Sequence, residues 1–417
     1  MKNKMRLFVV ETNNSGGLLH YTYQLCTAIS NENVDVTLIT ATDYELADFP
    51  HNFNVVKLFH LWKHFDPQSM QPHHLNFWQR GWKKIRWAIR RGWRGIHLLL
   101  AWVRLSLYII QNRPDIVQFT RIEFPFEAYF IGWMHRKGLF LTQICHEFEA
   151  RESKSRLASL LFRNNKDVYT YFSAIFFHAQ ENRNRFFSLY PSISEQKTYV
   201  IPHGNSSWLT TLKTAPNQLD LLRQQYGLQV GERVVLFFGL LSPSKGLDDL
   251  LDAFALARKS CTAKLLIVGY PTKYFDMDAF KARIETLNIT DQVILDSRYL
   301  PLDQISSVMS LATVAVYPYR SSTQSGALQA AYTFGRPVIA TVVGGLPEAV
   351  EDGQNGFLVP AQSPVVLAEK ITTLINDSDL VARMGKTAHF LSETRFSWQS
   401  IAQKIVKVYD GLLNSSL

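Results

Sequence analysis

Cysteine is scarce in this chain, with only three among its 417 residues, at positions 26, 145 and 261. They form no CxxC pair and no disulfide framework, which excludes a small disulfide-stapled scaffold and favours a reducing, cytoplasmic compartment. Histidines and carboxylates also show no cluster with the spacing of a metal site. The sequence therefore gives no reason to expect a bound metal.

Long apolar runs are also missing. The N-terminus has lysines followed by a four-residue apolar run at 7–10, which is too short for the core of a signal peptide. The longest apolar stretch, at 96–110, contains His97 and Arg104 and is shorter than the roughly 20 residues that a spanning helix needs. We therefore expect neither secretion nor a transmembrane anchor.

The common nucleotide-binding signatures GxGxxG and GxxxxGK[ST] are absent, which argues against a dinucleotide-binding enzyme and a P-loop enzyme. By composition, 47% of the residues are hydrophobic, 19% are charged and 13% are aromatic. That composition belongs to a globular protein and excludes a disordered or fibrous chain. The length predicts two or three domains, because a single core stops growing near roughly 250–300 residues.

The positive charge is confined to one half of the chain. Residues 1–205 carry 25 Lys+Arg and 16 Asp+Glu, a net +9, whereas residues 206–417 carry 19 of each and are neutral. Between Asp66 and Asp115 there is no acidic residue at all. The two halves therefore have different electrostatic character, as two domains with different partners would.

The acid-free stretch has helical periodicity. Its apolar positions, spaced by three or four, are Trp82, Ile85, Ile89, Trp93, Ile96, Leu100, Val103 and Leu107, while Arg86, Arg90, Arg91 and Arg94 project elsewhere. Such a basic helix suits an anionic membrane surface. A helix packed on the core, with a merely solvated basic side, explains the pattern equally well. Nucleic acid is not expected as a partner, since no motif for it accompanies the run.

Short β-branched runs alternate with helical patterns, which predicts parallel sheets covered by helices on both faces. The runs are 7–10, 34–39, 55–58, 116–119, 140–144, 174–178 and 198–201, then 234–238, 264–268, 293–295, 314–317 and 337–341. Residues 205–225 lack clear periodicity. We therefore expect an α/β protein with doubly wound domains at 1–205 and 226–396, joined by a linker at 206–225.

Ligands of such sheets bind beyond the carboxyl ends of the strands, so the residues after each run are candidates for a site. Gly16 and Gly17 precede a helix, where paired glycines let the backbone approach an anion; a plain tight turn explains them equally well. Lys245 stands just before another helix, where its ammonium can meet a phosphate. A solvated lysine is the alternative.

Two further groups follow predicted strands. Small polar residues crowd one strand-to-helix turn, namely Ser322, Thr323, Gln324 and Ser325 before Gly326. They can bind a sugar or a phosphate, although helix capping would need only one of them. Three histidines follow strands of the first half, at His146, His178 and His203. Each alone is more simply structural, but three in corresponding places indicate a polar cleft.

Taken in order, these segments resemble a retaining glycosyltransferase of family 4, of the group called glycosyl transferases group 1. The residues that carry the resemblance are 16–17, 20–22, 146–147, 201–205, 239–248, 298–301, 317–326, 335–338, 344–348 and 356–360. The family has the GT-B fold, in which two doubly wound, Rossmann-like domains face a central cleft. The resemblance also implies that 397–417 forms a helix that crosses back to the first domain.

The resemblance implies a role for each matched residue. The second domain would bind a nucleoside-diphosphate sugar and the first would bind the acceptor. Lys245 would stabilise the diphosphate and His146 would line the sugar pocket, as the catalytic residues. The donor would be bound by Gly16, Gly17, Ser242, Gly269, Arg298, Tyr299, Leu300, Ser322, Thr323, Gln324, Ser325 and Gly326. His20 and His203 would border the cleft on the acceptor side.

The sequence departs from the family pattern in three ways, one of which is the lack of an arginine common in the segment 239–245, where Leu240 and Ser242 stand here. Family members usually carry two glutamates eight residues apart, and these positions are Ser322 and Ala330 here. The segment Gln324-Ser325-Gly326 resembles a branch of the family that has this replacement. The departure leaves the donor sugar and the catalytic competence open.

The resemblance implies transfer of a sugar with retention of configuration and without a metal or other cofactor. The basic first half predicts an acceptor presented at a membrane, such as a lipid-linked glycan, with the protein peripheral on the cytoplasmic face. Two alternatives remain. One is a catalytically silent, membrane-associated binding subunit of the same fold. The other is a related enzyme such as a phosphorylase or an epimerase.

Overall fold

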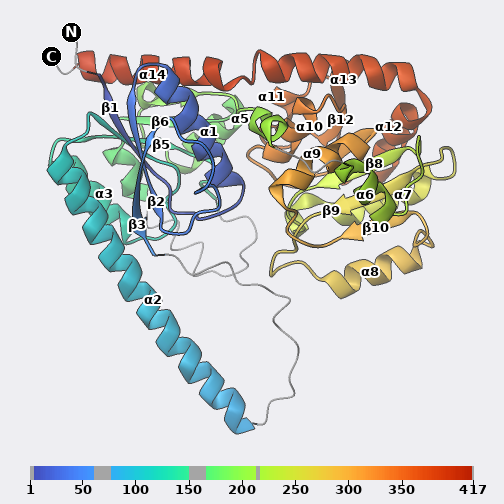
Figure 1. Ribbon diagram of the computed structural model, residues 1–417, viewed down its shortest axis with the longest axis horizontal. Coiled ribbons are helices and arrows are strands. Elements are labelled where there is room, and N and C mark those ends of the chain that lie inside the picture. Colours follow the sequence, from blue (N-terminus) through green and yellow to red (C-terminus); the bar gives the residue numbers. More distant parts are fainter. Residues whose placement is uncertain (1–3, 61–76, 150–165, 213–216, 416–417) are drawn as a thin grey trace.

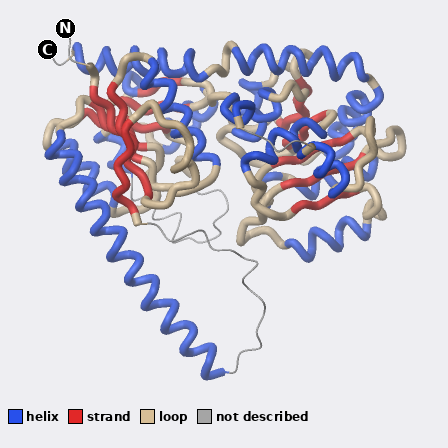
Figure 2. The backbone as a smooth tube through the Cα atoms, viewed as in Figure 1, coloured by secondary structure: helices blue, strands red, loops and turns tan. Residues whose placement is uncertain are grey.

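The computed structural model describes residues 4–60, 77–149, 166–212 and 217–415. Within 77–91 it describes the backbone helix but not the side chains. Two parallel sheets lie side by side in these residues, each covered by helices (Figure 2). Buried apolar strand residues fill the space between sheet and helices in both halves, which explains why the strands read as short β-branched runs.

The first domain is built on a seven-stranded parallel sheet with the order β3-β2-β1-β4-β5-β6-β7. Its strands are Arg6–Val10 (β1), Asp35–Ala41 (β2), Asn54–Phe59 (β3), Ile116–Phe119 (β4), Phe140–Ile144 (β5), Ala174–Phe177 (β6) and Thr198–Val200 (β7). Its helices are Gly17–Asn31 (α1), Phe77–Asn112 (α2), Glu127–Arg136 (α3) and Gln180–Leu189 (α5). The strand order reverses at β1, whose following loop therefore opens onto the ligand-binding edge of the sheet.

The second domain is built on a six-stranded parallel sheet with the order β10-β9-β8-β11-β12-β13. Its strands are Val234–Phe238 (β8), Lys264–Val268 (β9), Val293–Asp296 (β10), Val314–Tyr317 (β11), Val338–Thr341 (β12) and Gly356–Val359 (β13). Its helices are Leu247–Ala257 (α7), Met277–Thr286 (α8), Leu302–Leu311 (α9), Gly326–Thr333 (α10), Leu346–Ala349 (α11), Pro364–Asn376 (α12) and Ser378–Glu393 (α13). The sheet reverses at β8, so the segment that holds Lys245 also lies at a switch point.

The C-terminal helix joins the two domains. After α13, helix α14 (Trp398–Asn414) runs back along the first domain, and the two helices lie end to end along one side of the molecule (Figure 1). Trp398, Ile401, Ile405 and Tyr409 are buried in the first domain's core against α1. The helix that the resemblance implied at 397–417 is therefore present, and it anchors the first domain to the second.

The segment predicted as a linker is more ordered than expected. Residues Ser207–Thr211 form a 3-10 helix and Gln218–Gln225 form helix α6. Leu209 and Leu222 are buried in the second domain's core. Both helices are shorter than three turns, which is too short for their periodicity to be visible in the sequence. This part of 206–225 therefore begins the second domain rather than only connecting the two.

Helix α2 carries two apolar faces. Trp102, Leu105 and Ile109 are buried in the first domain's core. The face predicted from the sequence lies elsewhere and is exposed in its described part: Trp93, Ile96, Leu100, Val103 and Leu107 are 37–60% exposed. That face therefore does not pack on the core. The N-terminal part of the helix extends away from the domain (Figure 1).

Within the described residues, the stretch Gly92–Asn112 is long and apolar enough to cross a bilayer, as judged by length and composition alone. The expectation that no stretch reaches this length was therefore wrong. The buried side of the same stretch nevertheless packs against the sheet and α3. The ring of Trp102 stacks with Phe119 of β4 and with Phe130 of α3. A helix that is covered by a sheet-based domain on one side cannot be surrounded by lipid there.

Candidate active site between the two domains

The carboxyl ends of the two sheets face each other across the domain interface. Thr323, after β11, donates its hydroxyl to the carbonyl of His146, after β5 (2.7 Å), and the side-chain amide of Asn182 donates to the carbonyl of Thr323 (2.6 Å). Tyr299, after β10, contacts Glu45 in the first domain. Segments that the sequence singled out separately, up to 177 residues apart, thus meet in one place.

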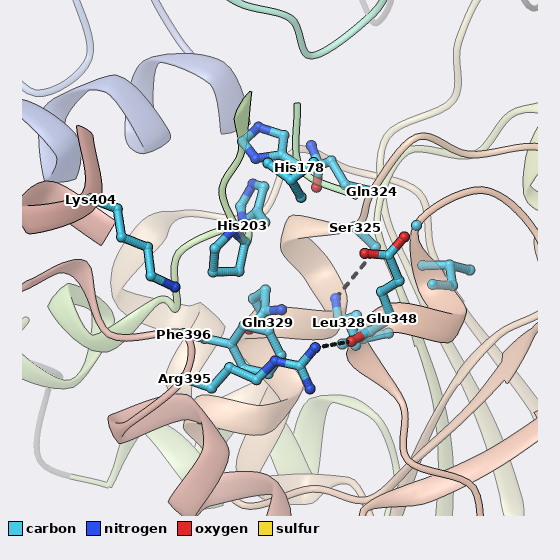
Figure 3. Close-up of a pocket in the computed structure, with 15 residues that line it drawn as sticks. His178, His203, Gln324, Ser325, Leu328, Gln329, Glu348, Arg395, Phe396 and Lys404 are labelled. Atoms are coloured by element: carbon cyan, nitrogen blue, oxygen red, sulfur yellow. Dashed lines mark hydrogen bonds between the residues drawn. The ribbon is translucent and has the colours of Figure 1, made fainter. Parts of the chain in front are cut away.

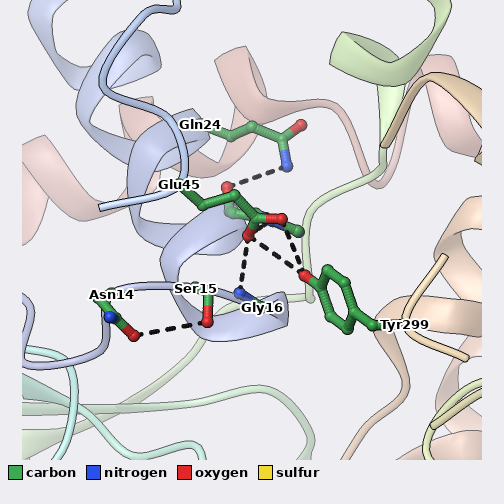
Figure 4. A network of polar contacts seen from close by, with 7 residues as sticks. Asn14, Ser15, Gly16, Gln24, Glu45 and Tyr299 are labelled. Atoms are coloured by element: carbon green, nitrogen blue, oxygen red, sulfur yellow. Dashed lines mark hydrogen bonds and ion pairs between the residues drawn. The ribbon is translucent and has the colours of Figure 1, made fainter. Parts of the chain in front are cut away.

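The predicted glycine loop begins helix α1 as expected. Gly16 has φ +84° and serves as the N-cap of the helix without a side-chain cap, so its conformation requires glycine. Its N–H donates to a carboxylate oxygen of Glu45 (3.0 Å), and the same oxygen lies 2.8 Å from Nε2 of His20 (Figure 4). A carboxylate therefore occupies the position at this helix N-terminus that suits an anion.

Lys245 follows β8 in the second domain and contacts an aromatic ring. Its ammonium is 3.7 Å from the ring centroid of Tyr319, and the hydroxyl of Tyr319 lies 3.2 Å from that of Ser325. The second domain thus brings the predicted diphosphate lysine and the polar turn together around Tyr319. Ser242, on the same segment, is buried, and its hydroxyl lies 3.0 Å from the hydroxyl of Ser244.

Much of the polar turn is occupied by internal hydrogen bonds. Ser322 donates to the carbonyl of Gln324 (2.7 Å), and Ser325 caps α10 by accepting from the N–H of Leu328 (3.1 Å). Thr323 is held by the first domain, as described above. The capping explanation is thus confirmed for Ser325. Among the described residues, the side-chain carbonyl of Gln324 is buried without a hydrogen-bond partner, so it is available to a ligand or water.

A glycine pair packs directly against the polar turn. A Cβ on Gly344 would overlap the carbonyl of Ser322, and one on Gly345 would lie 2.5 Å from the carbonyl of Thr323. The pair is therefore required for the close approach of the loop after β12 to the loop after β11. Ala330, where the family usually has its second glutamate, is 3% exposed in the first turns of α10.

The three histidines come together in one cluster, in which His146 and His178 are buried and His203 is half-buried. Nε2 of His178 lies 3.0 Å from Nδ1 of His146, and the ring of Tyr21 packs against His146, His178 and His203. Burial lowers the pKa of His146 to about 3 and that of His203 to about 4, and it holds the pKa of His178 well below its usual value. All three are neutral at physiological pH, and Nε2 of His146 has no partner among the described residues.

The predicted donor-binding segment 298–300 is firmly held. The guanidinium of Arg298 donates to Asp296 (2.9 Å) and to Gln304 (3.2 Å), and Asp296 also accepts from Tyr226. Leu300 is buried in the second domain's core, and the N–H of Gly269 donates to the carbonyl of Asp296. The side chain of Arg298 is thus occupied by contacts within the second domain.

A pocket of about 220 Å³ lies behind the polar turn. Its lining comes from both domains and from α14, and it includes His178, His203, Gln324, Ser325 and Gln329 (Figure 3). Neither Gly16, Lys245 nor Tyr299 lines it. The pocket therefore shares the polar turn with the predicted donor site but opens on the side of α14, away from the predicted lysine.

Among the residues that the structure describes, no group of three or more His, Cys, Asp or Glu side chains is placed to hold a metal ion. Charged side chains that do lie between the domains include Glu45, which contacts Tyr299, and Glu348, whose carboxylate accepts from the N–H of Glu181 (3.0 Å). Predicted membrane residues Trp93 and Arg94 lie on the described part of α2, whereas the side chains of Trp82, Arg86, Arg90 and Arg91 lie outside the described residues.

Sequence reasoning missed two residues at this interface, Glu45 and Asn182. Glu45 stands just after β2, on the strand edge where parallel sheets bind ligands, so the rule that selected the other segments could have found it. Asn182 stands in the first turn of α5 after β6 and carries no motif. Its role depends on Thr323, 141 residues away, and no local pattern signals that contact.

Comparison with known families matches residues 232–377 to the family described as glycosyl transferases group 1. A D-inositol 3-phosphate glycosyltransferase of Corynebacterium glutamicum is 30% identical over 201 residues, which is 47% of this chain and 47% of that protein. The chain thus spans about half the length of that curated relative. An uncharacterized glycosyltransferase of Methanocaldococcus jannaschii, MJ1178, is 26% identical over 73% of this chain and 85% of its own length.

Solved structures match the whole chain. Sucrose-phosphate synthase from Thermosynechococcus elongatus superposes with a TM-score of 0.71 at 18% identity, covering 99% of this chain and all of the other. Anabaena Alr3699/HepE in complex with UDP-glucose superposes with a TM-score of 0.68 at 20% identity, covering 98% of this chain and all of the other. Together with the two parallel sheets, these neighbours establish the predicted α/β GT-B fold.

Proposed function

We propose that this protein is a glycosyltransferase that moves a sugar from a nucleoside-diphosphate sugar to an acceptor hydroxyl. The observation that carries the proposal is a set of contacts at the facing ends of the two sheets. Lys245 and the polar turn meet around Tyr319, the polar turn contacts the first domain at His146, and the glycine loop contacts the second domain through Glu45 and Tyr299. The family match over 232–377 falls on the domain that holds Lys245 and the polar turn. A structural neighbour described in complex with UDP-glucose supports the class of donor.

In the proposed reaction, the bond between the sugar's anomeric carbon and the diphosphate oxygen breaks, and a bond to the acceptor oxygen forms on the same face. The acceptor's proton passes to the leaving diphosphate. Lys245 and the N-terminus of α10 stabilise the negative charge that develops on that diphosphate, since preorganised charges and dipoles act there without reorganisation. Fixed positive charge of this kind supplies what a metal would otherwise provide, so we propose a metal-independent, retaining transfer.

The experiment is a panel of UDP- and GDP-sugars with candidate lipid-linked acceptors, followed as release of nucleoside diphosphate and by mass spectrometry of the product. Release that requires an acceptor, with the product's anomeric configuration equal to the donor's, is the expected result. Absence of release and of any thermal shift with every donor would overturn the proposal. A requirement for free phosphate, or product formed without acceptor, would favour a phosphorylase or an epimerase.

A second candidate function rests on the missing glutamates. Ser322 is occupied by an internal hydrogen bond and Ala330 offers no polar group, so neither replaces a carboxylate that would hold the sugar or the ribose. A catalytically silent binding subunit would bind the nucleotide sugar without turning it over, even with its physiological acceptor. The same donor panel separates the two candidates, because binding is measured by thermal shift and turnover by release.

We further propose that the acceptor is presented at an anionic membrane, with the protein peripheral on the cytoplasmic face. The exposed apolar face of α2 supports this proposal, since Trp93, Ile96 and Leu100 are 48–60% exposed and Arg94 lies beside them. The acid-free stretch from 67 to 114 supplies the cations that attract anionic lipid. The opposite side of α2 is buried in the domain, so the helix would lie along the surface rather than cross the bilayer.

A further inference from the structure

A carboxylate occupies the N-terminus of α1. Glu45 lies in the loop after β2, where its backbone N–H donates to the carbonyl of Asn14 (2.8 Å) and thereby fixes the residue beside the glycine loop. Its side chain is 19% exposed and accepts from the N–H of Gly16 and from His20. Although burial alone raises the pKa of Glu45, the hydrogen bonds from His20 and Gly16 outweigh it and lower the pKa, so the group is ionised.

The same carboxylate also binds the other domain. The hydroxyl of Tyr299 donates to both oxygens of Glu45, at 3.0 and 3.2 Å (Figure 4). Tyr299 stands between Arg298, which is clamped by Asp296, and the buried Leu300, so its backbone is fixed in the second domain. Three donors from two domains therefore converge on one anion, and this anion belongs to the protein itself.

A diphosphate and this carboxylate compete for the same position. The glycine loop offers its N–H groups to an anion, and the proposed function places the donor's diphosphate there. A second negative charge within hydrogen-bonding distance of those donors would be repelled and would find the N–H of Gly16 occupied. The carboxylate must therefore move, or lose its contacts, before the diphosphate can bind.

We propose that Glu45 is an internal competitor for the donor's diphosphate. Glu45 contacts both the glycine loop and Tyr299 of the opposite domain until the donor displaces it. The proposal rests on the proposed function for the identity of the ligand. It makes Glu45 a determinant of donor affinity rather than a catalytic residue. Because the competitor must first be displaced, the apparent dissociation constant of the donor equals the intrinsic constant divided by the fraction of molecules in which the contact is broken.

The test measures binding of inorganic pyrophosphate, UDP and GDP by calorimetry. Glu45→Gln keeps the size of the side chain and removes its charge, and we expect about five- to tenfold tighter binding of pyrophosphate and of the nucleotide that binds. Tyr299→Phe removes only the contact from the second domain and should tighten binding less. Asp43→Asn is the matched control, since it removes one exposed negative charge from the same loop without touching Gly16.

Each outcome bears on the proposal. If Glu45→Gln binds pyrophosphate and nucleotide no more tightly than Asp43→Asn does, the competitor proposal is overturned. If the wild type nevertheless turns over donors, the proposed function stands without it. Tighter pyrophosphate binding in Glu45→Gln, with no turnover of any donor, supports the competitor and rejects the glycosyltransferase. No binding of pyrophosphate, UDP or GDP by any variant overturns both. Melting temperatures of all variants verify that each protein is folded.

Discussion

Lys245 is a cation that the structure places beside the polar turn, as the sequence predicted. Its ammonium rests on the ring of Tyr319, which in turn contacts Ser325 at the start of α10. We expect Lys245→Ala to lower kcat/KM by about 10²–10³, because one preorganised charge on a leaving group is worth roughly 3–4 kcal/mol. Release of nucleoside diphosphate at varied donor concentration measures the loss.

The matched control is Lys259→Ala, which removes an exposed lysine just beyond the far end of α7. It should leave the rate unchanged. Equal rates in Lys245→Ala and the wild type would remove this lysine from the mechanism. A loss of melting temperature in Lys245→Ala alone would mean that its contact with Tyr319 is structural.

The buried histidines give the protein a dependence on pH. Burial lowers the pKa of His146 to about 3 and that of His178 well below its usual value, whereas unfolded histidines titrate near ~6.5. Between about pH 6.5 and about pH 4, the unfolded chain therefore binds protons that the folded protein does not. The free energy of unfolding must fall as the pH is lowered through this window.

We expect His178→Gln to lose less stability than the wild type between about pH 6.5 and about pH 4, by at most about 1.4 kcal/mol per pH unit. Urea unfolding at several pH values measures both slopes. The carboxylates are the same in both proteins, so the difference between the slopes isolates the histidine. Parallel curves would show that His178 titrates normally in the folded protein.

Helix α2 has a buried apolar face and, in its described part, a second apolar face that is exposed. Trp102, Leu105 and Ile109 hold it on the domain, while Trp93, Ile96 and Leu100 contact no core. We expect the triple variant Trp93→Ser, Ile96→Ser, Leu100→Ser to lose co-sedimentation with anionic vesicles, because apolar insertion disappears. The remaining cations each contribute about 1 kcal/mol at an anionic surface, within a Debye length of roughly 8 Å, so residual binding should vanish at high salt.

The control for α2 is a triple variant at exposed apolar positions of the second domain, Val230→Ser, Val365→Ser and Phe390→Ser, which are 61–85% exposed. It should sediment like the wild type. Replacing Arg86, Arg90, Arg91 and Arg94 by Gln tests the electrostatic part separately. Equal sedimentation of every protein with anionic and neutral vesicles, at low and high salt, would reject the membrane role.

The elements were largely predictable because buried parallel strands leave a local signal. The runs at 116–119, 140–144 and 234–238 coincide with β4, β5 and β8. Strand β13 was not predicted, since Gly356–Val359 is a four-residue edge strand with only two β-branched or aromatic residues. Helix α6 was missed for a similar reason, being eight residues long.

The sequence was enough to predict which residues follow the strands at the candidate site, but not which of them contact one another. The positions of Gly16, Lys245 and the polar turn follow from strands that end before glycine or small polar residues. The bond between Tyr299 and Glu45 joins residues 254 apart, and it depends on how the two sheets face each other. Likewise, three histidines after three strands suggested a polar cleft. His178 and His203 do line a pocket, but the sequence could not show that all three rings pack around Tyr21 or that His146 is buried there.

At the scale of the whole molecule, two of the places where the described parts of the domains meet differ in the kind of contact that holds them. On the cleft side, single hydrogen bonds such as Thr323 to His146 and Tyr299 to Glu45 hold the facing edges. On the opposite side, α14 buries a row of apolar residues in the first domain. Hydrogen bonds can exchange with a ligand at small net cost, whereas the buried row cannot separate without exposing apolar surface. Any opening of the cleft must therefore pivot on α14.

That pivot is fixed by contact between one glycine and one tryptophan. The indole N–H of Trp398 donates to the carbonyl of Asn205 (2.9 Å), and the ring lies so close to Gly204 that a Cβ there would overlap it. We expect Gly204→Ala to lower the free energy of unfolding by about 1–3 kcal/mol, because the packed ring has to shift. Gly411→Ala is the control: it lies exposed within α14 with no atom near its Cβ position, and it should gain up to about 1 kcal/mol.

A double-mutant cycle separates this contact from a general effect of alanine. Trp398→Phe removes the part of the indole that a Cβ on residue 204 would overlap, so Gly204→Ala should cost markedly less in that background than in the wild type. Urea unfolding of the four proteins measures the coupling. If Gly204→Ala costs the same in both backgrounds, the loss does not come from this contact. In that case the anchor of the first domain lies further along α14, at Ile401, Ile405 and Tyr409, which are fully buried.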